Sequence, residues 1–140
     1  MSILGKGSIA ALKGIHPDLV KVITEAIKDT PVDFTVTDGV RTTAQQKALY
    51  SKGRTAGGSI VTNADGVKNK SNHQVKADGY GHAVDLYPYV NGKVDFNDSA
   101  NNLSIIAAHI KATAKCLGIA ITWGGDFKSI LDRPHFELNK

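Results

Sequence analysis

The stretch GHAVDLYPYVNGKVDF, residues 81–96, is the feature that most constrains the fold. Its residues alternate in the manner of a half-buried strand, and Asn91 followed by Gly92 is typical of a tight hairpin turn. The KVDF that follows can then return antiparallel to the first strand. Alternate residues of a strand face opposite sides, so His82 and Asp85 point away from each other. The sequence therefore predicts an antiparallel sheet with a carboxylate, Asp85, in a segment that looks buried.

Two helices are predicted before this hairpin. Residues 16–30 (HPDLVKVITEAIKDT) repeat apolar residues at helical spacing, so one face of this helix is expected to be buried. Residues 42–53 begin with Thr42 and have Gln45 three positions later, which is a capping-box pattern. A strand is expected between the two helices, at residues 32–37, where β-prone residues alternate.

A third helix is predicted after the hairpin, at residues 99–118, with Ser99 as its cap and Gly118 as its stop. Short strands are expected in IAIT and in PHFEL near the end of the sequence. Residues 54–78 are rich in Gly, Asn, Ser, Lys and Asp and are expected to be irregular, a trait common in functional or mobile segments. Helices and strands are not regularly interleaved, so the predicted class is α+β, a small, mostly antiparallel sheet packed with about three helices.

Composition limits the classes of protein that fit. The 140 residues, of which 41% are hydrophobic, suit one domain with one core. No apolar run approaches the roughly 18–20 residues that span a bilayer, so stable membrane insertion is not expected. The start, MSILGKGSIAALKG, lacks the charged and then apolar pattern of a signal peptide, so we expect the protein to accumulate in the cytoplasm where it is made.

The net charge and the cysteine content limit which partners and which metal ligands are expected. The net charge of +4 favours polyanionic partners, but aromatic residues make up only 6% and no long Lys/Arg run is present. We therefore expect no nucleic-acid partner. Cys116 is the only cysteine, which excludes an internal disulfide and a zinc site built from cysteines. Any metal must be held by His, Asp or Glu.

Three histidines lie near carboxylates in the sequence: His73, His82 and His135. A regular strand prevents His82 from sharing a metal with Asp85, whereas His73 can approach through the preceding loop. The C-terminal DRPHFEL adds Asp132 beside His135. Two histidines and one carboxylate form a common catalytic zinc set with an open position for water. Ordinary surface contacts, or the carboxylate pair of a glycosidase, remain open on spacing alone.

The segment SNHQVKADGYGHAVDLYPY resembles the Ser-x-His…Gly-x-Ala-x-Asp signature of a zinc peptidase family. The family includes phage L-alanyl-D-glutamate endopeptidases and bacterial D-alanyl-D-alanine carboxypeptidases and dipeptidases, such as those of vancomycin resistance. HPDLVKVITEAI, DFTVTDGVRTTAQQKALYSKG and DRPHFEL are similar to further parts of that family, in the same order. The resemblance covers nearly the whole chain and implies the D-alanyl-D-alanine carboxypeptidase or hedgehog-like fold, with zinc bound at the sheet.

The resemblance also implies roles for individual residues. His73, Asp85 and His135 match the ligands of one catalytic Zn²⁺. Asp132 matches the catalytic acid and base, and Arg41 matches the arginine that binds the substrate carbonyl and its developing oxyanion.

Three further residues receive weaker roles. Ser71 matches a serine that precedes the first ligand and helps to hold the substrate, and Gln45 is a second substrate-side candidate whose capping role is a sufficient alternative. Glu137 is expected to support a metal-bound histidine.

Together these features lead us to expect an endolysin that hydrolyses the L-Ala–D-Glu bond of the peptidoglycan stem peptide. Residues 1–140 would form one catalytic peptidase domain without a separate cell-wall-binding domain. The enzyme would act as a monomer, held in the host cytoplasm until a membrane pore releases it to the cell wall. The alternatives are a D-alanyl-D-alanine carboxypeptidase and a non-catalytic, metal-stabilised cell-wall-binding module.

Overall fold

The computed structural model describes residues 2–128 and 130–139. Within them, five strands form one sheet in the order β1-β2-β5-β4, with β3 paired to β2. The strands are β1 (Phe34–Asp38), β2 (Ala83–Val90), β3 (Lys93–Val94), β4 (Ile121–Trp123) and β5 (His135–Leu138). The helices are α1 (Lys6–Ala11), α2 (Pro17–Lys28), α3 (Thr43–Ser51), α4 (Asn102–Leu117) and the short 3₁₀ helix η1 (Gly124–Asp126). The α+β prediction is confirmed.

Strand β2 is the centre of the sheet, because it pairs antiparallel with β1, β3 and β5. The hairpin to β3 turns through Asn91 and Gly92, both of which have positive φ, as the sequence pattern predicts. The register places Asp85 opposite His135 on β5. Two of the predicted metal ligands are therefore direct neighbours across one strand pair.

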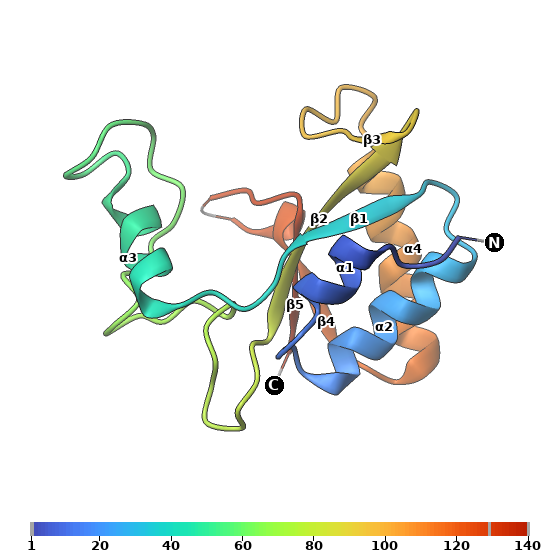
Figure 1. Cartoon of the computed structure of the whole chain (residues 1–140), viewed down its shortest axis with the longest axis horizontal. Helices are drawn as coiled ribbons and strands as arrows, with labels where there is room; N and C mark the ends of the chain where they lie inside the picture. The colour runs from blue at the N-terminus through green and yellow to red at the C-terminus, as the bar shows by residue number, and fades with distance from the viewer. Residues whose placement is uncertain (1, 129, 140) are drawn as a thin grey trace.

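Helices α2 and α4 cover one face of the sheet (Figure 1). The apolar face predicted for α2 is buried, and Ile23 packs in the same core as Ile106 of α4 and Phe136 of β5. The start of α2 is fixed by His16, whose Nδ1 accepts a hydrogen bond from the Asp18 N–H at 3.0 Å. This helical layer leaves the opposite side of the β2–β5 pair free to carry polar side chains.

Helix α3 stands away from the sheet and its helical layer (Figure 1). It begins with the predicted capping box, in which Thr42 and Gln45 each bond the other's backbone N–H. Residues 54–78 contain no helix and no extended strand, as expected, and the irregular segment runs on to residue 82 because β2 begins at Ala83. It is nevertheless organised by local hydrogen bonds, such as those that the Asp65 carboxylate accepts from three backbone N–H groups.

Two expectations about the helices need correction. Helix α1 was not expected from the sequence, so the described helices number four besides η1. Ser99 is not the cap of α4. That helix begins at Asn102, and the Asp98 carboxylate accepts hydrogen bonds from the Asn102 and Leu103 N–H groups. No helix among residues 2–128 and 130–139 is both long and apolar enough to cross a membrane.

Candidate metal centre

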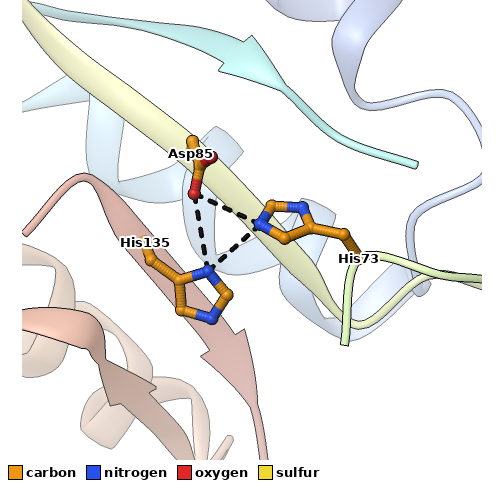
Figure 2. Close-up of side chains that lie close together, drawn as sticks. All are labelled: His73, Asp85 and His135. Carbon is orange, nitrogen blue, oxygen red and sulfur yellow. Dashed lines mark hydrogen bonds and ion pairs between the residues drawn. The ribbon is translucent and has the colours of Figure 1, made fainter. Parts of the chain in front are cut away.

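Three side chains from separate segments meet at one point (Figure 2). His73 comes from the loop before β2, Asp85 from β2 and His135 from the start of β5. Asp85 Oδ1 lies 3.2 Å from His73 Nε2 and 3.4 Å from His135 Nδ1, and the two nitrogens are 3.1 Å apart. All three atoms lie within 4.8 Å of one another, close enough to bind a single ion.

The outer nitrogens of both histidine rings are already engaged. His73 Nδ1 lies 2.9 Å from the Gly39 carbonyl oxygen, and His135 Nε2 lies 2.7 Å from Glu137 Oε1. Both partners can only accept, so each outer nitrogen donates its N–H. In the neutral rings, His73 Nε2 and His135 Nδ1 therefore turn lone pairs toward the same point. Two facing lone pairs need a cation between them.

The Asp85 carboxylate also indicates that a cation binds at this point. Asp85 Oδ1 is buried and has no hydrogen-bond partner among the residues that the structure describes. A buried oxygen of this kind is costly unless a proton or a metal ion compensates it. Although burial opposes the shift, the adjacent imidazoles of His135 and His73 lower the pKa of Asp85, so it stays ionised. Two imidazole nitrogens and one carboxylate oxygen are a donor set that fits Zn²⁺ with one position open.

The neighbouring carboxylates also act on His135. Burial alone would lower the pKa of His135, but the nearby carboxylates of Asp85 and Glu137 outweigh it and raise the pKa to about 9. Glu137 in turn accepts a 2.8 Å hydrogen bond from Asn72 Nδ2, which fixes its orientation. Glu137 thus holds the ring of His135, as expected from the sequence.

His82 lies apart from this group. Its Nε2 is 2.7 Å from Asp78 Oδ2, and among the described residues it belongs to no group of three His, Asp or Glu side chains close enough to share a metal ion. Strand alternation explains the separation, because His82 precedes β2 with side-chain parity opposite to that of Asp85.

Asp132 stands next to the three ligands. Its Oδ2 lies 3.7 Å from His135 Nδ1. Two backbone hydrogen bonds fix its position: the Asp132 N–H donates to the Gly124 carbonyl oxygen, and the His135 N–H donates to the Asp132 carbonyl oxygen. Burial and then the charge of Asp85 raise the pKa of Asp132 above the ordinary aspartate value. A carboxylate with a raised pKa is suited to take up and release a proton.

Arg41 faces the other oxygen of Asp85, at 3.7 Å from Oδ2. Asp38 Oδ2 accepts from Arg41 NH2 at 2.9 Å, and Gln46 Oε1 accepts from NH1 at 2.7 Å. Gln46 is fully buried, and its amide also donates to the Ala64 carbonyl oxygen. The sequence did not indicate Asp38 or Gln46 as supports of Arg41. The position of Gln46 on the inner face of α3, beside the capping Gln45, was the one available signal.

The two substrate-side candidates have different environments. Ser71 lines the cavity at the site, and its Oγ accepts a hydrogen bond from the His73 N–H at 3.1 Å, which helps to position that ligand. The side chain of Gln45 is engaged in the capping box of α3.

The site opens into a cavity of about 500 Å³ between the sheet and α3 with its following loop. The ligands, Asp132, Arg41 and Ser71 line it, and Tyr87 and Phe127 add aromatic surface. A cavity of this size is in the usual range for a bound small molecule or a short peptide.

Comparison with known proteins agrees with this geometry. The family described as "Phage L-alanyl-D-glutamate peptidase" matches residues 1–138. The chain is 34% identical to the L-alanyl-D-glutamate peptidase of Escherichia phage T5 over 136 residues, covering 97% of this chain and 88% of the phage T5 protein. It is 33% identical over 132 residues to the peptidoglycan L-alanyl-D-glutamate endopeptidase CwlK of Bacillus subtilis (strain 168), covering 89% and 73% of the two chains.

Solved structures give the same result for the fold. The L-Ala D-Glu endopeptidase ChiX of Serratia marcescens superposes with a TM-score of 0.70 at 29% identity, over 96% of this chain and 87% of that one. The vancomycin-resistance D,D-dipeptidase VanXYg superposes with a TM-score of 0.55 at 18% identity, over 89% of this chain and 50% of that one, which is a likeness of fold alone.

The chain therefore belongs to the phage L-alanyl-D-glutamate peptidase family. The family resemblance seen in the sequence is confirmed, as is the expectation of a peptidase.

Proposed function

We propose that this protein is a zinc-dependent endolysin that hydrolyses the L-Ala–D-Glu bond of the peptidoglycan stem peptide. The observation that carries the proposal is the convergence of two imidazole lone pairs and an orphaned carboxylate oxygen in a cavity that also holds Asp132 and Arg41. Family membership identifies the bond, since the phage T5 and Bacillus relatives are both named for L-alanyl-D-glutamate cleavage.

The ligands would be His73, Asp85 and His135. A Zn²⁺ ion held there would supply Lewis acidity, which lowers the pKa of water and polarises a carbonyl. Asp132 takes a proton from the attacking water and delivers it to the nitrogen of the leaving D-glutamyl group. Arg41 donates hydrogen bonds to the oxygen that gains negative charge, and its fixed guanidinium costs little reorganisation in that step. Ser71 and, more distantly, Gln45 are the proposed substrate-binding residues.

Several features of the biological setting belong to the same proposal. The chain would act as a monomeric, single catalytic domain on peptidoglycan, with neither nucleic acid nor membrane as its partner. It would be made in the host cytoplasm and reach the cell wall after release through a membrane pore.

The test compares lysis of purified peptidoglycan by native protein, by chelator-treated protein and by chelated protein with zinc restored. We expect loss of activity on chelation and its return with Zn²⁺. An Asp132→Asn variant should bind zinc at the native stoichiometry and lose activity by at least about a hundredfold, because the proton carrier is gone. Metal content is measured on the same samples.

The identity of the products decides the remaining alternatives. Release of a fragment with a new N-terminal D-glutamate supports the proposal, whereas release of D-alanine indicates a carboxypeptidase. If the zinc-loaded native protein binds peptidoglycan and cleaves nothing, the binding-module alternative replaces the enzyme.

A further inference from the structure

The charges that line the cavity come from different segments of the chain. Carboxylates gather beside the sheet, where Asp85, Asp132 and Glu137 lie near the candidate ligand His135. The residue after α3 and the loop that follows contribute Lys52 and Lys70 to the lining. The cavity lining therefore carries positive charge as well as the catalytic carboxylates.

The two lysines are free to bind a ligand. Both side chains are exposed, and neither has an ion pair or a side-chain hydrogen bond to any residue in the described part of the chain. Arg41, the third cation of the cavity, differs because Asp38 and Gln46 hold its guanidinium. Among the residues that the structure describes, Lys52 and Lys70 are thus the lysines and arginines of this cavity that have no ion pair.

The chemistry of the proposed substrate supplies a matching anion. In the stem peptide, D-glutamate is linked onward through its side-chain carboxyl, which leaves its α-carboxyl free. That α-carboxylate is attached to the carbon that bears the scissile nitrogen. It must therefore enter the cavity whenever the L-Ala–D-Glu bond reaches the catalytic groups. Asp132, which is not a proposed metal ligand, would repel it, and an unpaired cation in the cavity lining would offset that repulsion.

We propose that Lys52 and Lys70 bind the α-carboxylate of D-glutamate and make the enzyme selective for stem peptides in which that group is free rather than amidated. This inference rests on the proposed function. The ion pair is present in the bound substrate and in the transition state alike. Its loss should therefore raise KM and leave kcat nearly unchanged.

The experiment measures kcat and KM for two muramyl tripeptides that end in lysine amide, so that no other carboxylate lies beyond the scissile bond. One contains D-glutamate and the other D-isoglutamine, its α-amide. We expect the native zinc-loaded enzyme to prefer the free acid by roughly tenfold in kcat/KM. The variant Lys52→Met/Lys70→Met should lose this preference by a rise in KM for the free acid, with little change for the amide.

Two further variants test whether the preference depends on Lys52 and Lys70 themselves or only on the net charge of the protein. Lys47→Met removes the same charge from the exposed face of α3, outside the cavity, and should keep the preference. Lys52→Arg/Lys70→Arg retains both charges and should also keep it. Melting temperatures confirm that each variant is folded.

The outcomes distinguish the two levels of the proposal. If the native enzyme cleaves neither peptide, the proposed function fails. If it cleaves both with equal kcat/KM, or if the double methionine variant keeps the native preference, the function stands and the lysine assignment is overturned. A loss of preference in Lys47→Met also overturns it, because net charge would then be sufficient.

Discussion

His135 shows how one side chain is prepared for a metal by its neighbours. The 2.7 Å contact from its Nε2 to Glu137 fixes both the tautomer and the ring plane, and Asn72 holds Glu137 from the other side. Such outer hydrogen bonds usually contribute substantially to metal affinity. The position of Glu137 two residues beyond His135, on the same strand face, makes this arrangement possible.

Replacement of Glu137 by Gln should weaken Zn²⁺ binding by about 10- to 100-fold, because the amide retains an acceptor but loses the charge. Competition with a coloured chelator measures the affinity. Glu25→Gln is the matched control, since Glu25 pairs with Lys28 on the surface of α2. Equal affinity in both variants would show that Glu137 does not act through His135.

The grouping of His73, Asp85 and His135 could be predicted from the sequence because its motifs resemble those of a known family, and strand alternation separates His82 from Asp85. The supports of Arg41 could not. Asp38 and Gln46 approach it only after β1 and α3 have packed, and the sequence does not show that either one contacts Arg41. A buried polar network of this kind becomes visible only in three dimensions.

At the scale of elements, the start of α4 shows that the capping residue suggested by the sequence is not the one that caps the helix in the structure. Ser99 has a common capping residue type, but the chain turns through Asn101 in a left-handed conformation. As a result, Asp98 provides the capping carboxylate. Sequence alone does not determine which of several adjacent polar residues caps a helix when the preceding turn is irregular.

Asp98→Ala should therefore lower the free energy of unfolding by about 1 kcal/mol, whereas Ser99→Ala should leave it nearly unchanged. The Asp98 variant also loses an ion pair with Arg133, at 3.4 Å. Urea denaturation of the two variants measures both effects. A larger loss in Ser99→Ala would contradict the capping assignment.

The loop around Asp65 should respond to pH. Hydrogen bonds from the N–H groups of Asn69 and Val67 lower the pKa of Asp65, so the carboxylate stabilises the folded loop above its ordinary pKa. That contribution is lost as the pH falls through the lowered value.

Hydrogen exchange of the Val67, Lys68 and Asn69 amides, corrected for intrinsic rates, should therefore show protection at neutral pH and progressively less protection as the pH falls below the ordinary aspartate pKa of about 3.9. Asp65→Asn cannot titrate and should show a flatter pH profile. Protection that is independent of pH in the native chain would contradict the assignment.

Helix α1 marks the limit of what the sequence predicted about the fold. Its six residues carry no periodic pattern long enough to identify it. Tertiary contacts hold it instead, since buried Ser8 Oγ accepts from the Val36 N–H and lies 3.2 Å from Thr35 Oγ1 on β1. The longer helices α2 and α4 were predictable because burial of one face requires the repeat that their sequences show.

For the molecule as a whole, a bound metal would join segments far apart in the chain. His73 lies in the long loop and the other two ligands lie on adjacent strands, so an ion that binds the folded state alone stabilises all three together. At a free zinc concentration about a hundred times Kd, the expected gain is about 2.7 kcal/mol.

Thermal unfolding of chelated and zinc-loaded protein should show this gain as a higher Tm with zinc. Asp85→Asn should greatly reduce the shift, and Mg²⁺ should produce little, because it prefers a shell of oxygen ligands. An equal shift in the Asp85 variant would place the stabilising ion elsewhere.

The direct pairing of Asp85 with His135 has a consequence for assembly of the sheet. A slip of β5 by one residue would turn every one of its side chains to the opposite face and carry the imidazole away from the carboxylate. An ion that requires both groups can therefore bind only the correctly aligned strand pair. Zinc would therefore stabilise the correct alignment of β2 and β5 during folding. A chain in which the two strands are misaligned would not retain the ion.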